Sequence, residues 1–538
     1  MDFHFASTWE VIADTIPRKK ALICDDVTRS WAEFDDRAAC FASALSQAGL
    51  GLDAKVGLYL HNGNQYLEAQ YGVFKIRGCP INVNYRYKSD ELVYLLDNAD
   101  AQALVFQSQY AMRIWEIRHR LPKIKLFIQV NDGTEDLLEG AVDFEQAILK
   151  NNPAPRIARA VDDVYMLYTG GTTGLPKGVM YEGGQFCFNL LALGAASRGL
   201  NPPATLAELP DYIRSLDSHP VTLPACPLMH GTGMWLGCFV SLAQGGSVVT
   251  IPRLGFNPDL LWTEVERHSV TDLVIVGDAF ARPMLGALDD ALSRGDPYDL
   301  TSVKQITSSG VMWSSEVKQG LLKHRDMNLV DIIGSTEGGM GSSTTSRSQL
   351  AATAKFTLNA GVKVFNDTDQ EVAPGSGEMG MVASAGAPLG YYKDPEKSAQ
   401  TFREIGGVRY SFPGDFATVE ADGSITLLGR GSACINTAGE KVFPEEVEEA
   451  VKKHSSVVDC LVVGVPDERF GQKVVALAST RAEPPAEVEV IDFTRELLAG
   501  YKIPKHVLFV PEVRRAANGK ADYKWANATA LKAYGSHG

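Results

Sequence analysis

A run rich in glycine and threonine near residue 170 has the residue types needed to bind phosphate. It follows a strand-like apolar segment at residues 164–167 and reads Tyr168-Thr169-Gly170-Gly171-Thr172-Thr173-Gly174-Leu175-Pro176-Lys177-Gly178-Val179. Backbone N–H groups without bulky side chains can approach phosphate oxygens closely, and Lys177 adds a positive charge. The spacing is not that of a Walker loop, GxxxxGKS/T. The run therefore favours a polyphosphate-binding loop of another kind, and a Gly/Thr-rich surface turn is the alternative.

Four other residues become candidates through the short motifs around them. Taken alone, Glu337 is an ordinary carboxylate at the start of a helix, and Asp415 suits a turn. Lys520 lies in a polar segment where lysines are usually solvated, and His230 precedes an apolar segment where histidines are often capped core residues. The motifs must therefore decide whether these side chains do chemistry.

The motifs follow one another in a recognisable order along nearly the whole chain. Besides the phosphate loop they are Pro227-Leu228-Met229-His230-Gly231, Ser308-Ser309-Gly310-Val311, Gly334-Ser335-Thr336-Glu337, Gly377-Glu378, Gly390-Tyr391-Tyr392, Gly414-Asp415, Gly429-Arg430, Gly439-Glu440-Lys441-Val442-Phe443-Pro444-Glu445-Glu446 and Asn518-Gly519-Lys520. This series resembles the acyl-adenylate-forming superfamily, which comprises acyl-CoA synthetases, peptide-synthetase adenylation domains and luciferases.

The resemblance implies a role for each motif residue. Glu337 and Thr173 would hold Mg²⁺, since a hard cation that bridges phosphates prefers oxygen ligands. Asp415 would accept hydrogen bonds from the ribose hydroxyls, and Arg430 would also reach the nucleotide. The catalytic residues implied are Lys520, Glu337, Thr173 and His230. The residues implied to bind the nucleotide or CoA are Thr169, Gly170, Gly171, Thr172, Gly174, Lys177, Gly310, Val311, Asp331, Gly334, Ser335, Thr336, Asp415, Arg430, Gly439 and Glu440.

The activity implied is a two-step ligation that uses ATP, Mg²⁺ and CoA. Lys520 would stand between the acid and the α-phosphate during adenylation, because attack of one anion on another needs charge neutralisation. The small domain would then rotate about Ser432, so that Gly439 and Glu440 help to build the pantetheine tunnel. His230 would gate the route between acyl pocket and thiol tunnel.

Two residues depart from the pattern of the family. The position before Gly334 is usually aromatic and packs on adenine, but here it is Ile333. The hinge position two residues after Arg430 is usually Asp or Lys, but here it is Ser432. These departures keep open a degenerate homologue that senses nucleotide or acyl-CoA without turnover.

The acid is expected to present an apolar body. Residues 231–236 carry no charge that could pair with the ammonium of an amino acid, and an unpaired buried ammonium would be costly. Gly231 and Gly233 predict a wide pocket mouth. Within the ligases the chain most resembles the steroid side-chain and bulky fatty acyl-CoA ligases. Medium- or long-chain fatty acids and aryl acids remain open.

The elements that must position these residues alternate between strand-like and helical patterns. Strands are predicted at residues 55–60, 103–106, 125–130, 247–251 and 272–276. This alternation favours an α/β fold with layered, largely parallel sheets. We predict a large N-terminal adenylate-forming domain at residues 1–430, in which mixed sheets are layered with helices.

A smaller α+β domain is predicted at residues 431–538, as a mobile lid for AMP binding and thioester formation. Its predicted elements are a helix at 445–453, strands at 457–463 and 473–478, a helix at 490–499 and a strand at 506–510. Residues 196–219, with three prolines, are predicted to be an insertion or mobile loop.

Composition excludes several other classes. The 538 residues carry a formal net charge of −14 and no long basic block, which argues against nucleic-acid binding. The eight cysteines form no CxxC pair and no secretory leader is evident, so reduced thiols in the cytoplasm are expected. Prolines and glycines interrupt the uncharged segment 221–252, which predicts a buried helix at 234–245 rather than a membrane span. A homodimer is considered.

Overall fold

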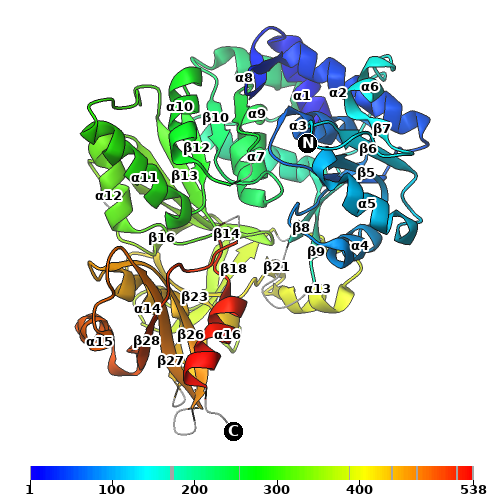
Figure 1. Cartoon of the computed structure of the whole chain (residues 1–538). Helices are drawn as coiled ribbons and strands as arrows, with labels where there is room; N and C mark the ends of the chain where they lie inside the picture. The colour runs from blue at the N-terminus through cyan, green and yellow to red at the C-terminus, as the bar shows by residue number, and fades with distance from the viewer. Residues whose placement is uncertain are drawn as a thin grey trace.

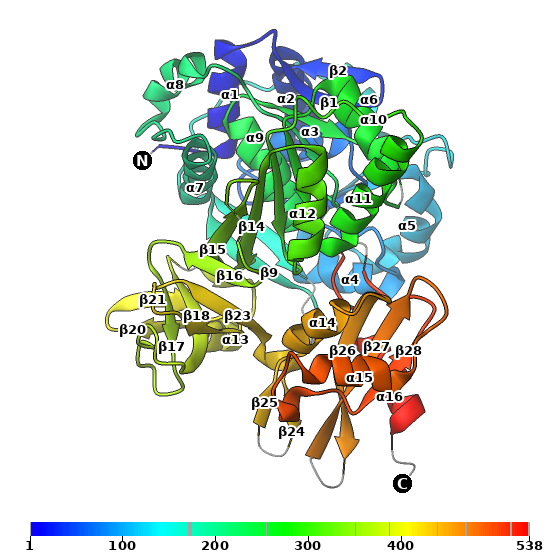
Figure 2. The same ribbon diagram turned by 90° about the vertical axis from the view of Figure 1, so that its left-hand side faces the viewer.

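The computed structural model of the chain separates a large N-terminal part from a smaller C-terminal unit (Figures 1 and 2). It describes residues 2–169, 175–253, 255–349, 351–386, 388–437, 440–467, 471–516 and 519–535. The expected architecture of layered mixed sheets with helices and a small α+β unit is confirmed.

One sheet of the N-terminal part is wholly parallel and covered by helices. Its strands, in spatial order, are β4 (Cys79–Asn82), β3 (Lys55–Tyr59), β5 (Ala101–Gln107), β6 (Leu126–Val130) and β7 (Val142–Asp143). The first six helices are α1 (Phe5–Thr15), α2 (Trp31–Gln47), α3 (Asn64–Lys75), α4 (Ser89–Asn98), α5 (Ala111–Ile117) and α6 (Phe144–Leu149). Every residue of β3 is buried, as expected of a parallel strand with helices on both faces.

A second, larger sheet begins parallel and continues antiparallel. Its parallel portion, edged by β2 (Val27–Ser30), contains β1 (Lys20–Cys24), β11 (Ser247–Thr250), β10 (Val221–Pro224), β12 (Asp272–Ile275), β13 (Gln305–Ser309) and β14 (Asn328–Ser335). The antiparallel portion contains β15 (Gly338–Thr345), β16 (Lys355–Leu358), β23 (Ile425–Arg430), β22 (Asp415–Val419), β18 (Met379–Ala385), β17 (Val362–Phe365), β21 (Val408–Ser411) and β20 (Phe402–Ile405). The helices along this part of the chain are α7 (Gly183–Ala196), α10 (Pro258–His268), α11 (Asp278–Ser293) and α12 (Ser315–His324).

A small antiparallel sheet carries the two ends of the glycine-threonine loop. Its strands are β8 (Val164–Thr169), β9 (Lys177–Glu182) and β19 (Gly390–Tyr391), and α13 (Pro395–Thr401) follows β19. Thr169 pairs with Lys177 in register, so the loop is the turn of the β8–β9 hairpin.

The C-terminal unit has a sheet of its own, drawn in orange in Figures 1 and 2. Its strands are β24 (Ile435–Thr437), β25 (Glu440–Val442), β26 (Val457–Asp467), β27 (Gly471–Thr480) and β28 (His506–Phe509). Its helices are α14 (Pro444–Lys452), α15 (Glu487–Arg495) and α16 (Tyr523–Tyr534). The helix predicted at 490–499 begins earlier, at Glu487, because acidic residues in a first turn interact favourably with the helix dipole.

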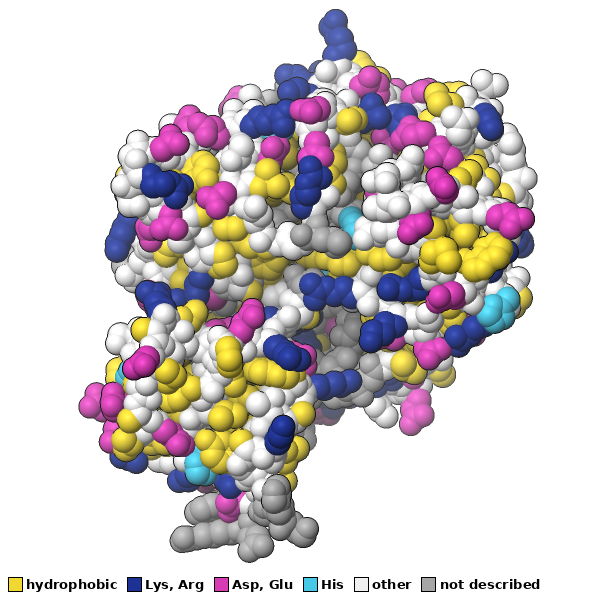
Figure 3. All heavy atoms as spheres, in the orientation of Figure 1, with side chains coloured by type: hydrophobic (Ala, Val, Ile, Leu, Met, Phe, Trp, Pro, Cys, Tyr) yellow, Lys and Arg dark blue, Asp and Glu magenta, His cyan; other side chains and the backbone are white. Residues whose placement is uncertain are grey.

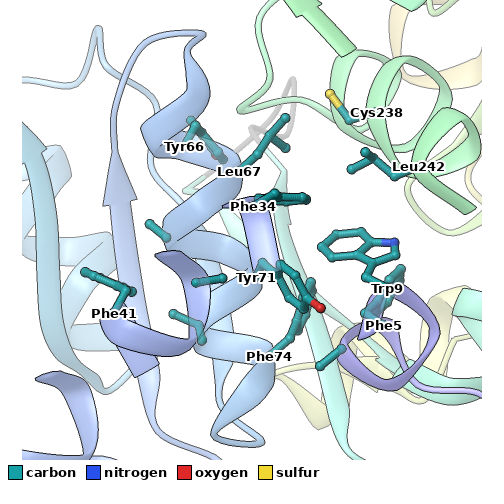
Figure 4. Packing of buried hydrophobic residues seen from close by; sticks show 14 of the residues in the cluster. Phe5, Trp9, Phe34, Phe41, Tyr66, Leu67, Tyr71, Phe74, Cys238 and Leu242 are labelled. Atoms are coloured by element: carbon teal, nitrogen blue, oxygen red, sulfur yellow. The ribbon is translucent and has the colours of Figure 1, made fainter. Parts of the chain in front are cut away.

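Aromatic side chains from distant segments hold the core of the N-terminal part together (Figure 4). The ring of Phe5 lies 4.8 Å from that of Phe74 and 4.7 Å from that of Phe239. Trp9 packs edge-on against Tyr71 at 5.0 Å. Offset and edge-to-face pairs of this kind stabilise a core beyond the area that they bury. The N-terminal helix is thereby fixed to α3 and to the segment that follows His230.

Two segments of this part test expectations from the sequence. The predicted buried helix is present as a π-type helix, η4 (Thr232–Phe239), continued by α9 (Val240–Ala243), and among the described residues no helix is long and apolar enough to cross a membrane. The segment 196–219, predicted as a loop, instead contains the helix α8 (Leu209–Ser215). Leu209 and Ile213 are buried in the main core, which explains why this proline-rich segment is helical.

Candidate active site

A cleft separates the N-terminal part from the C-terminal unit. Its volume is about 630 Å³, and both parts of the chain line it. The charged residues of its lining are Arg86, Arg253, Asp278, Arg282, Lys452, Asp459, Glu512 and Arg515. Figure 3 shows Lys and Arg side chains, in dark blue, along the boundary between the two parts. Val311 and Gly519, which belong to predicted site motifs, also line the cleft.

Of the residues predicted to bind phosphate, the structure describes those at the two ends of the loop. Gly170, Gly171, Thr172, Thr173 and Gly174 lie outside the described residues, whereas Thr169 ends β8 and Lys177 begins β9. The Nζ atom of Lys177 lies 2.6 Å from Oδ2 of Asp394 at the start of α13. The ammonium of Lys177 is thus already paired, and its role toward phosphate stays a prediction.

Glu337 lies in the tight turn between β14 and β15. Its backbone N–H donates to Oγ of Ser335 at 3.1 Å. Its Oε1 accepts a hydrogen bond of 2.7 Å from the hydroxyl of Tyr391 on β19. The turn of the large sheet is therefore tied to the sheet that carries the phosphate-loop hairpin. Of the predicted nucleotide residues, Thr336 shares this turn, and Gly334 and Ser335 end β14 just before it.

Gly310 and Val311 follow β13, and Gly310 adopts a φ of +95°, which glycine accommodates without strain. Asp331 of β14 is nearly fully buried and pairs with Nζ of Lys318 on α12 at 3.2 Å. Burial raises the pKa of Asp331 to about 6 despite the nearby Lys318. Asp331 is thus held by an internal ion pair, which the motif did not indicate.

Asp415 and Arg430 begin and end two adjacent strands, β22 and β23, and pair in register. Nε of Arg430 lies 3.3 Å from Oδ1 of Asp415. The other carboxylate oxygen, Oδ2, is buried and has no hydrogen-bond partner among the described residues. Burial raises the pKa of Asp415, and Arg430 opposes this shift. A buried acceptor with spare capacity fits a donor from a ligand, such as a sugar hydroxyl.

Lys520 comes from the C-terminal unit to the residues just described. Its side chain is accessible to solvent, but the surrounding protein desolvates the ammonium and lowers its pKa. The positive charge of Arg430 lowers that pKa further, while the negative charges of Glu337 and Asp415 oppose the shift. The two cations and two carboxylates therefore lie close enough to influence one another.

His230 lies half-buried at the end of the segment that leads into η4. Its carbonyl oxygen accepts from the N–H of Met234 at 2.9 Å. Desolvation, followed by the positive charges of Lys520 and Arg86, lowers its pKa from 6.5 to about 3. The imidazole is therefore neutral at neutral pH.

The lowered pKa of His230 predicts how the free energy of unfolding depends on pH. The unfolded histidine binds a proton below about pH 6.5, whereas the folded one stays neutral down to about pH 3. Proton binding by the unfolded chain therefore lowers the free energy of unfolding as pH falls below about 6.5, and above pH 6.5 this loss is absent. We expect His230→Gln to lose less unfolding free energy than the wild type between about pH 7 and pH 5, measured by urea titration. His119→Gln, at an exposed position, is the control, and equal losses in all three proteins would contradict the shift.

The segment that joins the two parts is tightly packed. The short helix η5 (Gly431–Ala433) connects β23 to β24, and a Cβ at Gly431 would clash with the ring of Phe416. A Cβ at Gly429, whose φ is +132°, would clash with the carboxylate of Glu445. Burial raises the pKa of Glu445 to about 7. This contact between α14 and β23 was not anticipated from the sequence.

Glu440, one of the two residues predicted to act with CoA, is not at the same place as Lys520. Gly439 lies outside the described residues, and Glu440 begins β25 at an exposed position. Figure 2 shows the β24–β25 hairpin on the side of the C-terminal unit that points away from the N-terminal sheets. Glu440 is therefore remote from the other candidate residues.

The expected wide pocket mouth at Gly231 and Gly233 is wrong. A Cβ at Gly231 would lie 3.1 Å from the ring of Trp235, and one at Gly233 would clash with the carbonyl of Pro227. Both glycines serve close packing instead of open space. Trp235 is itself held by a hydrogen bond of 2.9 Å from its Nε1 to the hydroxyl of Tyr165.

The structure thus brings five predicted residues together at the boundary of the two parts: Glu337, Asp415, Arg430, Lys520 and His230. Lys177 and Asp331 are engaged in ion pairs, and Glu440 is remote. Sequence reasoning missed Tyr391 and Glu445. Gly390-Tyr391-Tyr392 was recognisable as a motif, but no local signal showed that the phenol reaches Glu337.

Comparisons with known proteins place this site in a family. The sequence profile of the AMP-binding enzyme family matches residues 9–392, and that of the AMP-binding enzyme C-terminal domain matches residues 446–520. A 3-oxocholest-4-en-26-oate–CoA ligase of Rhodococcus rhodochrous is 39% identical over 98% of this chain and 96% of its own length. A medium/long-chain-fatty-acid–CoA/3-oxocholest-4-en-26-oate–CoA ligase of Mycolicibacterium smegmatis is also 39% identical, with the same coverage.

Solved structures share the fold. An anthranilate CoA ligase in complex with anthranoyl-AMP superposes with a TM-score of 0.85 at 22% identity, covering 99% of this chain and 98% of that one. A benzoate CoA ligase from Burkholderia xenovorans superposes with a TM-score of 0.80 at 21% identity, covering 98% and 100%. The fold and the site define a two-part nucleotide-binding enzyme. The chain belongs to the AMP-binding enzyme family, which confirms the resemblance to the acyl-adenylate-forming superfamily.

Proposed function

We propose that this protein is an ATP-dependent acid:CoA ligase that forms an acyl-AMP and then an acyl-CoA. The observation that carries the proposal is the meeting of Lys520, Arg430, Asp415, Glu337 and His230 between the two parts of the chain. The named CoA ligases that share 39% of the sequence support the same reaction type. We propose domains at 1–430 and 431–538, with the boundary just before η5.

In the first step, a carboxylate oxygen of the acid attacks the α-phosphorus of ATP. The bond from this phosphorus to the bridging oxygen breaks, and pyrophosphate leaves with that electron pair. Both reactants are anions, so positive charge placed where negative charge accumulates lowers the barrier. Lys520 and Arg430 supply that charge, while Asp415 orients the nucleotide by accepting from the ribose through its spare Oδ2.

Mg²⁺ is the metal that these residues fit. Among the described residues no cluster of three or more His, Cys, Asp or Glu side chains could cage a metal ion. Mg²⁺ commonly needs only one or two carboxylates together with substrate phosphates and water. Glu337 supplies a hard oxygen ligand, and Thr173 is proposed as its hydroxyl partner. When bound, the ion would neutralise charge on the phosphates of ATP.

The conformation described here suits adenylation. Lys520 lies near Glu337 and Asp415, whereas β25 with Glu440 points away. We propose that the C-terminal unit rotates about Ser432 after the first step, which withdraws Lys520 and brings in Gly439 and Glu440. One site can then serve two transition states in turn.

In the second step, the sulfur of CoA attacks the carbonyl carbon of the acyl-AMP, and AMP leaves. The cleft is suited to admit this polyanionic thiol, because Arg86, Arg253 and Arg282 lie along its N-terminal wall. We propose that His230, whose imidazole is neutral, gates the route between the acyl pocket and the thiol. A neutral imidazole can move without the cost of desolvating a charge.

The acid is proposed to be bulky and apolar. Residues of η4, which begins two residues after His230, are uncharged and mostly buried, so they offer no partner for a charged substituent. The names of the relatives support a steroid side-chain acid or a medium- to long-chain fatty acid. An aryl acid is the other ligase alternative. The alternative from another class is a sensor that binds nucleotide or acyl-CoA without turnover. In such a sensor the charges of Lys520, Glu337 and Asp415 would have no role in catalysis.

Cytoplasmic location and homodimer formation remain proposals. All eight cysteines are free thiols, and six are buried. This distribution suits a reducing compartment, where buried cysteines behave as small apolar residues.

The test is pyrophosphate release from ATP and Mg²⁺, with and without CoA, across steroid, fatty and aryl acids. We expect turnover that depends on CoA and is fastest with a steroid or fatty acid. Turnover without any effect of CoA would indicate another acceptor, best turnover on benzoates would contradict the bulky acid, and silence across the panel would favour a sensor.

A further inference from the structure

Tyr391 is buried at the junction of two sheets and makes one contact that links the site together. It is 7% exposed, and its ring packs on that of Phe402 with centroids 5.3 Å apart. Its hydroxyl donates to Oε1 of Glu337 at 2.7 Å, across from one sheet to the other. The position of the Glu337 carboxylate is therefore coupled to that of the Tyr391 hydroxyl.

The backbone of Tyr391 fixes where its hydroxyl can go. Tyr391 pairs with Val179 of β9, the strand that leaves the phosphate loop. Its N–H donates to Oγ of Ser398 on α13 at 2.8 Å. With the main chain and the ring both held, the phenol oxygen has little freedom. A rigid donor of this kind can impose one orientation on the carboxylate that it binds.

The phenol is suited to remain a donor. In this pair the phenol O–H donates and the carboxylate oxygen of Glu337 accepts. One oxygen of Glu337 is thereby reserved for Tyr391, which directs the other toward a ligand of the site.

We propose that Tyr391 is a positioning residue, which holds the Glu337 carboxylate at a fixed place relative to β9 so that its other oxygen is available to Mg²⁺. This inference rests on the proposed role of Glu337 as a metal ligand. A cation that bridges a carboxylate and phosphates needs a fixed separation between them. Two contacts fix where the Glu337 carboxylate lies relative to β9. They are the backbone pairing of β19 with β9 and the hydrogen bond from the phenol of Tyr391 to Glu337.

The neighbouring residue provides a matched control. Tyr392 is also partly buried, and its hydroxyl donates to Oδ2 of Asp100 at the same distance of 2.7 Å. Tyr392→Phe thus removes the same atom and the same kind of hydrogen bond at the adjacent position, but away from Glu337. Tyr391→Phe keeps the ring that packs on Phe402, so the core should remain filled.

The experiment measures ATP binding by calorimetry to the full chain, once with Mg²⁺ and once with a chelator. In Tyr391→Phe we expect the gain in ATP affinity that Mg²⁺ provides to fall by about 10–100-fold, the usual effect of removing a group that orients a metal ligand. ATP affinity in the chelator should not change. In pyrophosphate release, the Mg²⁺ concentration for half-maximal rate should rise, and saturating Mg²⁺ should restore most of kcat. Tyr392→Phe should resemble the wild type in every assay.

Glu337→Gln separates failure of the inference from failure of the proposed function. If Glu337→Gln loses the Mg²⁺-dependent gain and Tyr391→Phe keeps it, the positioning role is wrong and the metal ligand stands. If Glu337→Gln itself behaves as the wild type, the metal role of Glu337 fails and takes the inference with it. Weaker ATP binding by Tyr391→Phe in the chelator, or misfolding of this variant alone, would show that the phenol supports the structure generally, and would overturn the proposal.

Discussion

Replacing Lys520 by alanine is expected to slow acyl-adenylate formation by about 10²–10³-fold, the usual loss on removing one donor that stabilises developing charge. Lys520 is the cation that the C-terminal unit contributes beside Glu337 and Asp415. Without this positive charge, the negative charges of the carboxylate and of the α-phosphate of ATP are less well neutralised as the two groups approach. In the proposed cycle this lysine withdraws before the thiol attacks, so thioester formation from supplied acyl-AMP should continue at a rate close to that of the wild type.

The measurement compares the two half-reactions by rapid quench. Lys524→Ala is the matched control, because Lys524 is an exposed lysine on the neighbouring helix α16 and no role is proposed for it. A Lys520→Ala enzyme that adenylates at the wild-type rate would falsify the role of this lysine. Equal slowing of both half-reactions would instead contradict the withdrawal of Lys520 between them.

Replacing Asp415 by alanine is expected to weaken ATP binding by at least about 100-fold. The two hydrogen bonds from ribose hydroxyls to a carboxylate would each contribute about 1.5–3 kcal/mol, as bonds to charged groups do. The substitution also removes the partner of Arg430, which lies 3.3 Å away. Asp415→Asn should lose less, because an amide oxygen can still accept one of the bonds.

Calorimetric titration with ATP measures this effect directly. Asp422→Ala is the control, since Asp422 lies in the exposed turn that connects the same two strands, β22 and β23. An unchanged affinity in Asp415→Ala would mean that the ribose is bound elsewhere. In that case the unpaired Oδ2 would need another explanation.

The contact between Glu445 and Gly429 also bears on the proposed rotation. Glu445 belongs to α14 of the C-terminal unit, while Gly429 lies in β23 of the N-terminal part, next to its last residue, Arg430. Movement about Ser432 would separate them and return a buried carboxylate to water. Since burial raises the pKa of Glu445 from 4.5 to about 7, its ionisation increasingly favours the separated arrangement as pH rises from about 4.5 to about 7.

The sequence predicted the fold class and indicated candidate site residues because both rest on local patterns. The strands expected at 55–60 and 247–251 appear as β3 and β11, within a residue of their ends. Burial on both faces requires continuous apolar runs, and such runs are visible without a structure. Glu337 and Asp415 were found in the same way, because each lies in a short motif whose turn needs particular residues.

Other features depended on segments that are distant in the chain. The stretch at 206–215, which contains Pro210, is helical because Leu209 and Ile213 are buried in the main core. The sequence predicted a wide pocket mouth at Gly231 and Gly233, but Trp235 and Pro227 approach these glycines closely. In each case the sequence displays the residue and not the neighbour that decides its role.

By itself, the sequence therefore determined which family the chain belongs to, which charged residues are candidates for its chemistry, and where strands and helices alternate. Only the tertiary structure decided that Lys177 is paired with Asp394, that Asp331 is held by Lys318, and that Tyr391 reaches Glu337. The physical reason is that a motif fixes backbone geometry over a few residues, whereas a side chain's partner is set by packing summed over the whole core.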